Sequence, residues 1–457
     1  MILSLHRLER LGGGFDLAIF TQYTWLLGHG LDPFNTINGK PLLGDHVEPG
    51  LVLFAPLGAL GLGADGLLVA QAVVLALVAP VLFAIGRATG ARPWLACVVP
   101  VLWLLSPLTY GPNLYEFHPE ATAPLFLALA ALGLVTHRTW LFAVAVVLAI
   151  SLKEDIALTV AMLGVVAAFL GRRRLGLVTA AAASIWFLVS VGLVLPAFGR
   201  SIQDEYGPRF VGGRGDSLGE LARWGVAHPG AALASVFSAS DLGLLAILVV
   251  ATAGLCLLAP LWLLAAVPSL LANFVAAYSP QHSIWFQYYL VPWGAAAVAA
   301  AVGVGAVSRL SPRLRLMAGV LATAIAVLSL PYSVQRIDEL VTPTAGARMP
   351  DPGDVRAALA LARGGRPVAA SGRLVAHLAQ RREVYVLPFP FLGVRPGETW
   401  TRADLDRRAR RVRLVIYDRT QPETSEFAGL YRRIPGELRR RGFHVVRDTG
   451  SIVVFER

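Results

Sequence analysis

The chain has 457 residues, of which 56 % are hydrophobic and only 15 % are charged. Soluble domains are roughly 45–50 % apolar and about 25 % charged, so this composition excludes both an ordinary soluble protein and a disordered one. The formal net charge is +11, and residues 333–457 hold most of it, with 23 Arg against 14 acidic residues. Lysine occurs only at Lys40 and Lys153, a bias typical of a GC-rich genome, so we expect no nucleic-acid partner. Two cysteines in apolar runs exclude a disulfide framework.

Apolar runs predict ten membrane-spanning helices, because a span needs about 20 mostly apolar residues. The predicted spans are 67–86, 94–110, 120–136, 139–152, 156–171, 175–197, 241–259, 261–278, 288–307 and 316–332. The run 51–62 is too short to cross, and we expect it to be re-entrant or to extend the next helix.

Arginines in the short loops predict the orientation, because such loops face the cytoplasm. Nine arginines and no acidic residue occupy one set of loops, at 87–92, 138, 172–174 and 309–315. The other loops then face outward, as does everything after residue 333. We therefore expect a multi-pass protein of the plasma membrane with an extracytoplasmic C-terminal domain.

The domain organisation follows from these spans. We expect a first outer loop with a juxtamembrane amphipathic helix (1–66), a transmembrane domain (67–332), a linker (333–353) and a soluble α/β domain (354–457). Residues 1–14 would begin outside without a signal-peptide pattern, so we expect the natural start to lie upstream, with a first helix missing.

The C-terminal domain shows strands alternating with helices, which predicts a mostly parallel sheet. The predicted strands are 367–370, 383–388, 413–417, 443–447 and 451–455, and the predicted helices are 371–381, 402–411 and 427–441.

Titratable residues gather at the outward ends of the predicted spans. They are Asp16, Asp45, His46, Glu48, Glu116, His118, Glu120, Lys153, Glu154, Asp155 and His282. An ionisable group at or inside a span costs several kcal/mol unless it is paired, so its presence indicates a functional site. Because separate segments place such groups on one side of the membrane, we predict that they form a single site.

Structural roles remain open for the same residues. Asp16 could be the N-cap of the helix that follows, and Glu120 could complement the positive end of its own helix. Residues 153–155 could be a polar hairpin tip, and His282 could belong to an interfacial aromatic belt. The group at 45–48 could bind a divalent cation, although its spacing is not diagnostic and no cofactor is firmly implied.

Several motifs resemble one known family. The strings FDLAIFTQYTWLLGHGLDPF, GKPLLGDHVEPGLVLFAPLGAL, NLYEFHPEA, LKEDIAL and ASGRLVAHLAQRREVYVLP look like the uncharacterised bacterial membrane-protein family called domain of unknown function 2079. The opening is more distantly similar to integral-membrane glycosyltransferases of the type C fold, which carry an acidic residue early in the first outer loop. That resemblance implies a polyprenyl-phosphate-linked sugar as donor and an outward-facing acceptor.

The resemblance also implies roles for the residues. Asp16, although followed by Leu17 rather than a second acid, would be the general base on the acceptor hydroxyl. Lys153 and His118 would stabilise the departing lipid phosphate. The predicted catalytic residues are Asp16, Asp45, His46 and Glu48, and the predicted substrate-binding residues are His118, Glu120, Lys153, Glu154, Asp155 and His282. Asp45, Glu120 and Asp155 would orient these groups or hold a divalent ion.

Two other functions fit the same composition. Carboxylates and histidines among spans also build proton- or ion-coupled transporters, but those place their coupling sites near the midplane rather than at the outer ends. A non-enzymatic lipid-binding protein, acting through its C-terminal domain, is the third alternative.

Overall fold

The computed structural model describes residues 1–199, 218–236, 238–341, 349–393, 400–421 and 427–457. It contains two compact units, each described below by itself. Unit 1 consists of Met1–Asp45, Leu51–Ala70 and Asp338–Arg457, and unit 2 consists of His46–Gly50 and Gln71–Ile337. Residues 342–348 of the predicted linker lie outside the described residues.

Apolar helices occur at each of the ten predicted spans. Within the described ranges, five are long and apolar enough to cross a membrane: Gly63–Ala88, Pro93–Tyr115, Arg173–Ala197, Gln287–Val307 and Pro312–Ser329. The other predicted spans match shorter apolar helices, Pro119–Val135, Thr139–Ile150, Ile156–Phe169, Ser240–Ala251 and Pro260–Val275. Most of the run predicted to be too short to cross, residues 51–59 of 51–62, lies in the short helix Pro49–Ala59. The chain is therefore a polytopic helical membrane protein.

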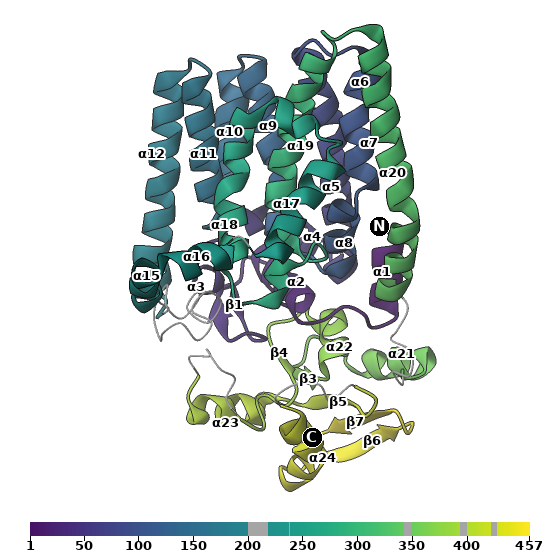
Figure 1. Cartoon of the computed structure of the whole chain (residues 1–457). Coiled ribbons are helices and arrows are strands. Elements are labelled where there is room, and N and C mark those ends of the chain that lie inside the picture. Colours follow the sequence, from purple (N-terminus) through teal and green to yellow (C-terminus); the bar gives the residue numbers. More distant parts are fainter. Residues whose placement is uncertain (200–217, 237, 342–348, 394–399, 422–426) are drawn as a thin grey trace. The chain divides into compact units, whose positions relative to one another are not determined.

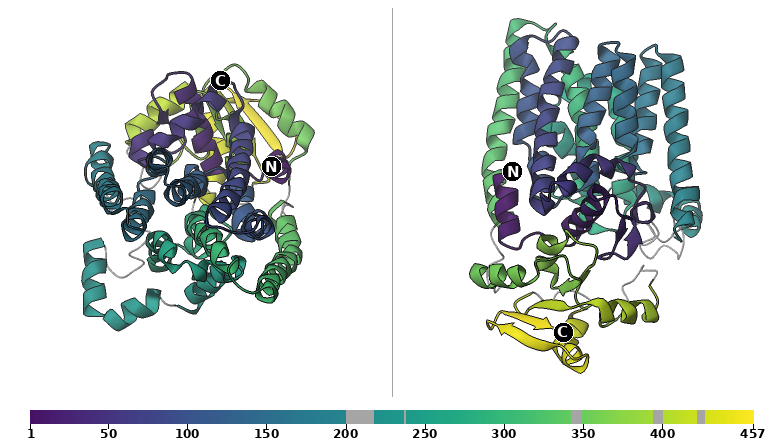
Figure 2. Two further views of the ribbon diagram at one scale, coloured as in Figure 1. Left: turned by 90° about the horizontal axis from the view of Figure 1, so that it is seen from above. Right: turned by 180° about the vertical axis from the view of Figure 1, so that it is seen from behind.

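Most of these helices belong to unit 2. Its regular elements include α5 (Gly63–Ala88, shared with unit 1), α6 (Pro93–Ala96), α7 (Val98–Leu105), α8 (Pro107–Tyr115), η2 (Pro119–Thr122), α9 (Ala123–Val135), α10 (Thr139–Ile150), α11 (Ile156–Phe169), α12 (Arg173–Val189), α15 (Leu218–Ala227), α16 (Pro229–Val236), α17 (Ala239–Ala251), α18 (Val267–Val275), α19 (Leu290–Val307) and α20 (Pro312–Val341). The view from above in Figure 2 shows the long helices end-on.

Small residues let neighbouring helices of unit 2 approach closely. Helices α9 to α12 stand side by side in Figure 1 and in the right-hand view of Figure 2. A Cβ on Gly164 of α11 would lie 2.6 Å from the backbone nitrogen of Ala180 in α12. A Cβ on Gly176 would lie 2.4 Å from the backbone nitrogen of Ala168. Each glycine is followed four residues later by an alanine, the small-xxx-small pattern by which membrane helices pack through their backbones.

Helix α19 lies in the core of unit 2. In the segment Gln287–Val307, 89 % of the most apolar 18-residue stretch is buried. The rings of Trp103 and Trp293 stack with centroids 5.5 Å apart. Their indole nitrogens donate to Leu75 O and Thr109 Oγ1, so both large side chains are buried without losing a hydrogen bond.

Unit 1 contains the predicted C-terminal sheet. Its strands are β3 (Val368–Ala370), β4 (Val384–Val386), β5 (Leu414–Asp418), β6 (His444–Asp448) and β7 (Ile452–Glu456), in the order β4-β3-β5-β7-β6. The helices beside them are α21 (Pro352–Leu361), α22 (Gly372–Val375), α23 (Arg402–Arg411) and α24 (Ala428–Arg440). The strand positions confirm the sequence prediction.

The prediction of a mostly parallel sheet is only half right. Strand β3 pairs in parallel with β4 and β5, whereas β7 is antiparallel to both β5 and β6. The physical reason for the β6–β7 pairing is the connection between these two strands, which runs only from Thr449 to Ser451. Parallel neighbours need a crossover of a dozen or more residues, so this short link can form only a hairpin.

The N-terminal segment of unit 1 covers the edge strand β4. Thr36 Oγ1 donates to Val384 O at 2.7 Å and accepts from Val384 N–H at 3.0 Å. Gln22 Nε2 contacts Thr36 Oγ1 and the carbonyl oxygens of Arg381 and Arg382. These contacts occupy backbone groups that an uncovered edge would expose for aggregation.

Gln22 belongs to helix α2 (Phe15–Gly28), which departs from the prediction. The sequence predicts an amphipathic helix with one stripe along Leu17, Phe20, Thr24 and Leu27. In the structure, Ile19 and Tyr23 between the predicted stripe positions are buried as well. Helix α2 packs against α4 (Ala55–Ala59), β1 (Phe34–Asn35) and α22. Because these elements cover it on several sides, residues outside the predicted stripe are buried as well.

Candidate functional site

The predicted site residues fall in both units. Asp16 and Asp45 belong to unit 1, and the others belong to unit 2. Those of unit 2 are His46, Glu48, Glu116, His118, Glu120, Lys153, Glu154, Asp155 and His282. The two groups are therefore described separately.

A buried ion pair joins two of the predicted residues in unit 2. Lys153 Nζ lies 3.0 Å from Glu120 Oε1, and the two side chains are only 6 % and 9 % exposed. Glu120 lies on η2, and Lys153 precedes α11 after the end of α10. Removing two charges from water costs several kcal/mol per ion, which close contact only partly offsets. Residues 153–155 do form the turn between α10 and α11, as the hairpin-tip alternative has it, but Lys153 is buried in that turn.

Glu154 fixes the motif at 46–50 onto the same turn. Its carboxylate is wholly buried, with Oε1 3.0 Å from His46 Nδ1 and Oε2 accepting from Val47 N–H at 2.8 Å. Gly50 N–H donates to Ser151 O at 2.7 Å. A Cβ on Gly50 would lie 2.5 Å from Ser151 Oγ, so a glycine is needed at this close approach. Two segments more than 100 residues apart are thus held together through one carboxylate.

Electrostatic contacts extend this arrangement to further predicted residues. The negative charge of the Glu120 carboxylate is attracted by Lys153 and also by His118 and His46. Asp155, an exposed residue that precedes α11, interacts with Lys153 and Glu154. We call His46, His118, Glu120, Lys153 and Glu154 the polar cluster of unit 2.

Gln71 supports the polar cluster and was not singled out from the sequence. Its Nε2 donates to Glu116 O at 3.1 Å, and its Oε1 accepts from His118 N–H at 3.0 Å. Gln71 is wholly buried in the apolar helix α5. Its amide is the only polar side chain in the predicted span 67–86. A polar residue inside a span indicates a functional role, so this position could have been found from the sequence.

Glu48 and Glu116 are also buried, with 1 % and 6 % of their surfaces exposed. Glu48 follows the segment held by Glu154, and Glu116 offers its backbone carbonyl to Gln71. Both residues therefore share segments with members of the polar cluster.

His282 takes part in a different contact. Its Nδ1 lies 3.0 Å from Asp241 Oδ1, and its Nε2 lies 2.7 Å from Ala276 O. Asp241 lies in the first turn of α17 and is 1 % exposed. Both ring nitrogens thus face acceptors, and His282 ties α17 to the segment before α19. Asp241 is a buried acid that the sequence analysis did not select.

In unit 1, Asp16 lies in the first turn of α2, whose N-cap is Gly14. The alternative that Asp16 is the N-cap is therefore wrong. Asp45 accepts from Lys40 Nζ at 2.8 Å and from Asn38 Nδ2 at 2.6 Å. Lys40 and Lys153 are the two lysines of the chain, and each is paired with a predicted site carboxylate.

The donor set gives no support for a metal centre. Within the described ranges, no three His, Cys, Asp or Glu side chains are arranged to hold a metal ion. The polar cluster instead offers a cation beside carboxylates and imidazoles, which is an arrangement suited to proton transfer and anion stabilisation.

Comparisons with known proteins give the following matches. The family model described as predicted membrane protein (DUF2079) matches residues 7–454. No curated protein matches the chain. Among solved structures, ArnT from Cupriavidus metallidurans bound to undecaprenyl phosphate is 14 % identical with a TM-score of 0.49, covering 99 % of this chain and 95 % of that one. The apo structure of the same protein is 14 % identical with a TM-score of 0.47, covering 98 % and 95 %.

Proposed function

The chain belongs to the DUF2079 family of predicted membrane proteins, as its motifs indicated, and we propose that it is a membrane glycosyltransferase. In this proposal it moves a sugar from a polyprenyl-phosphate donor to an acceptor on the outward face of the membrane. We infer a polyprenyl-phosphate donor from the resemblance of the first outer loop to type C glycosyltransferases. The polar cluster offers a cation and carboxylates, which suit the transfer of a sugar from such a donor.

The observation that carries the proposal is the buried Lys153–Glu120 pair beside the Glu154–His46 contact. These side chains come from segments far apart in the sequence and are held at the ends of apolar helices. Buried charges at such positions are costly, so their retention indicates a function that needs them. A lysine ammonium is a compact cation suited to an anionic leaving group.

The proposed reaction is a single inverting displacement at the anomeric carbon. Asp16 takes the proton of the acceptor hydroxyl as the oxygen forms its bond to that carbon. The bond from the anomeric carbon to the phosphate oxygen breaks, and the lipid phosphate leaves with the electron pair. Lys153 and His118 stabilise the charge that develops on this phosphate.

The remaining predicted residues support this step. Glu154 and Glu120 hold His46 and Lys153 in place through the contacts described above. Asp45, His46 and Glu48 complete the acid–base set, and Asp155 adds a carboxylate near Lys153. We assign His282 a supporting role in shaping the substrate site.

A turnover assay tests the proposal. The purified full-length protein is offered a panel of polyprenyl-phosphate sugars, and release of the lipid phosphate is measured. Asp16→Asn should lower turnover by roughly 100-fold or more, as expected when a general base is removed. Asp32→Asn, a change at an exposed acid in the same loop, is the matched control and should leave turnover unchanged.

Two results would count against the proposal. If Asp16→Asn turned over as fast as the wild-type protein, Asp16 could not be the general base. Donor binding that never leads to release, with or without Asp16, would favour a lipid-binding protein instead.

A further inference from the structure

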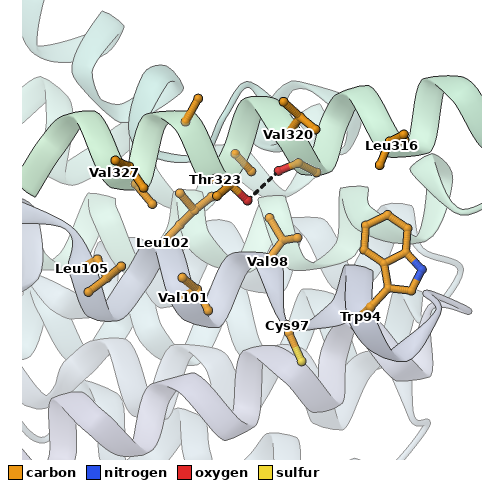
Figure 3. Close-up of a pocket in the computed structure, with 14 residues that line it drawn as sticks. Trp94, Cys97, Val98, Val101, Leu102, Leu105, Leu316, Val320, Thr323 and Val327 are labelled. Atoms are coloured by element: carbon orange, nitrogen blue, oxygen red, sulfur yellow. Dashed lines mark hydrogen bonds between the residues drawn. The ribbon is translucent and has the colours of Figure 1, made fainter.

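An apolar groove runs between α7 and α20 in unit 2 (Figure 3). Its volume is about 770 Å³, and Val101, Leu102, Val320 and Val327 are among its lining side chains. The hydroxyl of Thr323 also lines it but donates to Gly319 O of its own helix at 2.9 Å. Both walls belong to segments apolar and long enough to cross a membrane. The groove is therefore suited to a hydrocarbon chain rather than to water or a polar ligand.

The groove exists because α20 meets α7 through small side chains. Ala322 and Ala326 pack against Leu102 and leave room beside this line of contact. A second apolar groove of about 480 Å³ shares Leu102 and Ala326 and extends to the other side of α20. Only 11 % of the most apolar stretch of Pro312–Ser329 is buried, so α20 offers most of its surface to the bilayer.

Arginines gather where the first groove ends near Trp94 and Leu316. They lie in the last turn of α5, in the loop before α6, in the loop between α19 and α20, and in the first turn of α20: Arg87, Arg92, Arg309, Arg313 and Arg315. The two loops meet at Ser308, because Arg92 N–H donates to Ser308 Oγ at 3.1 Å and Arg315 Nη1 donates to Ser308 O at 3.2 Å.

These arginines form a rim with unbalanced positive charge. Residues 86–94 and 305–316 contain no acidic residue. In the part of the chain that the structure describes, no carboxylate pairs with any of the five arginines. Arg92 is exposed and Arg315 is half-buried, and the partly exposed ring of Trp94 lies beside them. An aromatic ring next to basic side chains is typical of the level of lipid headgroups.

We propose that this groove and its arginine rim bind one anionic phospholipid. The phosphodiester would contact Arg92 and Arg315, and one acyl chain would lie between α7 and α20. Charge complementarity selects the headgroup, because basic sites between spanning helices on the cytoplasmic side attract anionic lipids. The segment Pro93–Tyr115 separates this rim from the polar cluster at its other end. The bound phospholipid is therefore not the donor of the proposed transfer, and the inference is independent of that function.

The thiol of Cys97 allows a direct test, because it lines the groove. Cys97 is exposed, whereas Cys256 is buried, so one thiol should react first. The rate of Cys97 alkylation by a maleimide is measured on the full-length protein in detergent. Added phosphatidylglycerol should slow the reaction roughly tenfold relative to phosphatidylcholine with the same acyl chains. Cys97→Ser should abolish the fast labelling.

Two paired variants separate headgroup recognition from general basicity. Arg92→Gln combined with Arg315→Gln should remove the preference for phosphatidylglycerol. Arg173→Gln combined with Arg174→Gln is the matched control, because these exposed arginines lie in another predicted cytoplasmic loop and not on the groove. The control should keep the preference.

Three results would overturn the inference. They are equal protection by both lipids, no protection by either, and a preference that persists in the Arg92 and Arg315 variant. If that variant does not fold, the comparison of the two lipids on the wild-type protein still decides the question.

Discussion

The two lysines of this chain lie in ion pairs of different character. Lys40 and Asp45 of unit 1 are five residues apart, with side chains 17 % and 15 % exposed. Lys153 and Glu120 of unit 2 are 33 residues apart, with side chains 6 % and 9 % exposed. The first pair holds a local loop together, where water still screens the charges. The second pair joins distant segments in a drier place, which indicates a requirement beyond stability.

The largest expected effect follows from removing the cation of the deeper pair. Lys153→Met leaves the Glu120 carboxylate buried without its partner and should lower the free energy of unfolding by about 3–5 kcal/mol. Unfolding by SDS in mixed micelles measures this. The double variant Lys153→Met with Glu120→Met should recover most of the loss, because an apolar pair can replace a buried ion pair. A loss below about 1 kcal/mol in Lys153→Met would show that water reaches the pair.

A smaller effect is expected from Glu154→Gln. The amide keeps one acceptor for two donors, so either His46 Nδ1 or Val47 N–H loses its bond, at about 1–3 kcal/mol. The same unfolding experiment measures this. Asp155→Asn changes the exposed neighbouring acid, which interacts with Lys153 and Glu154 only through its charge, and a smaller loss is expected from it. Equal losses in both variants would mean that the charge of the turn matters, rather than the contact with residues 46 and 47.

Removing Lys40 should cost less than removing Lys153. Lys40→Met should lower the free energy of unfolding by about 1 kcal/mol or less, because the pair is partly exposed and Asn38 still donates to Asp45. Turnover is the second readout, since Asp45 is a proposed catalytic residue. A loss as large as that of Lys153→Met would show that the two ion pairs contribute equally to stability, contrary to the difference proposed here.

The smallest expected effect is a pH dependence in unit 1. Burial lowers the pKa of His377 below its ordinary value of about 6.5, although the charge of Asp65 partly opposes this. The unfolded chain therefore takes up this proton first as pH falls. Stability should be complete above about pH 6.5 and should decline below it, through the folded-state pKa. Melting temperatures between about pH 7.5 and 5 measure this, and His377→Gln should flatten the profile. A profile unchanged in the variant would assign the slope to other groups.

The predictable part of the fold is the part set by local pattern. Continuous apolar runs locate the helices, and short β-branched runs such as 413–417 locate the strands. The antiparallel half of the sheet was missed because alternating strands and helices resemble a parallel sheet until the short hairpin after β6 is considered. Nothing local to α2 revealed that its polar Gln22 would face the backbone of residues 381 and 382.

For the candidate site, the sequence singles out charged residues but not the contacts between them. Charged residues in apolar surroundings drew attention to Glu120, Lys153 and Glu154, and the structure joins each to a partner. The choice of partner depends on tertiary contacts over 33 and 108 residues, which no spacing rule contains. Asp241 and Lys40 were missed as partners because an acid in a first turn and a lysine in a loop are ordinary in sequence.

The covering of strand β4 by Thr36 has a consequence for the order of synthesis. Unit 1 is made from residues 1–45 and 51–70 and the last 120 residues, with residues 71–337 between them. At about 5–20 residues per second, a ribosome needs roughly 15 to 50 s to make the intervening stretch. During that time Gln22 and Thr36 lack the backbone partners in residues 381–384 that they have in the finished protein. The newborn N-terminal segment must therefore be kept from other partners until the end of the chain arrives.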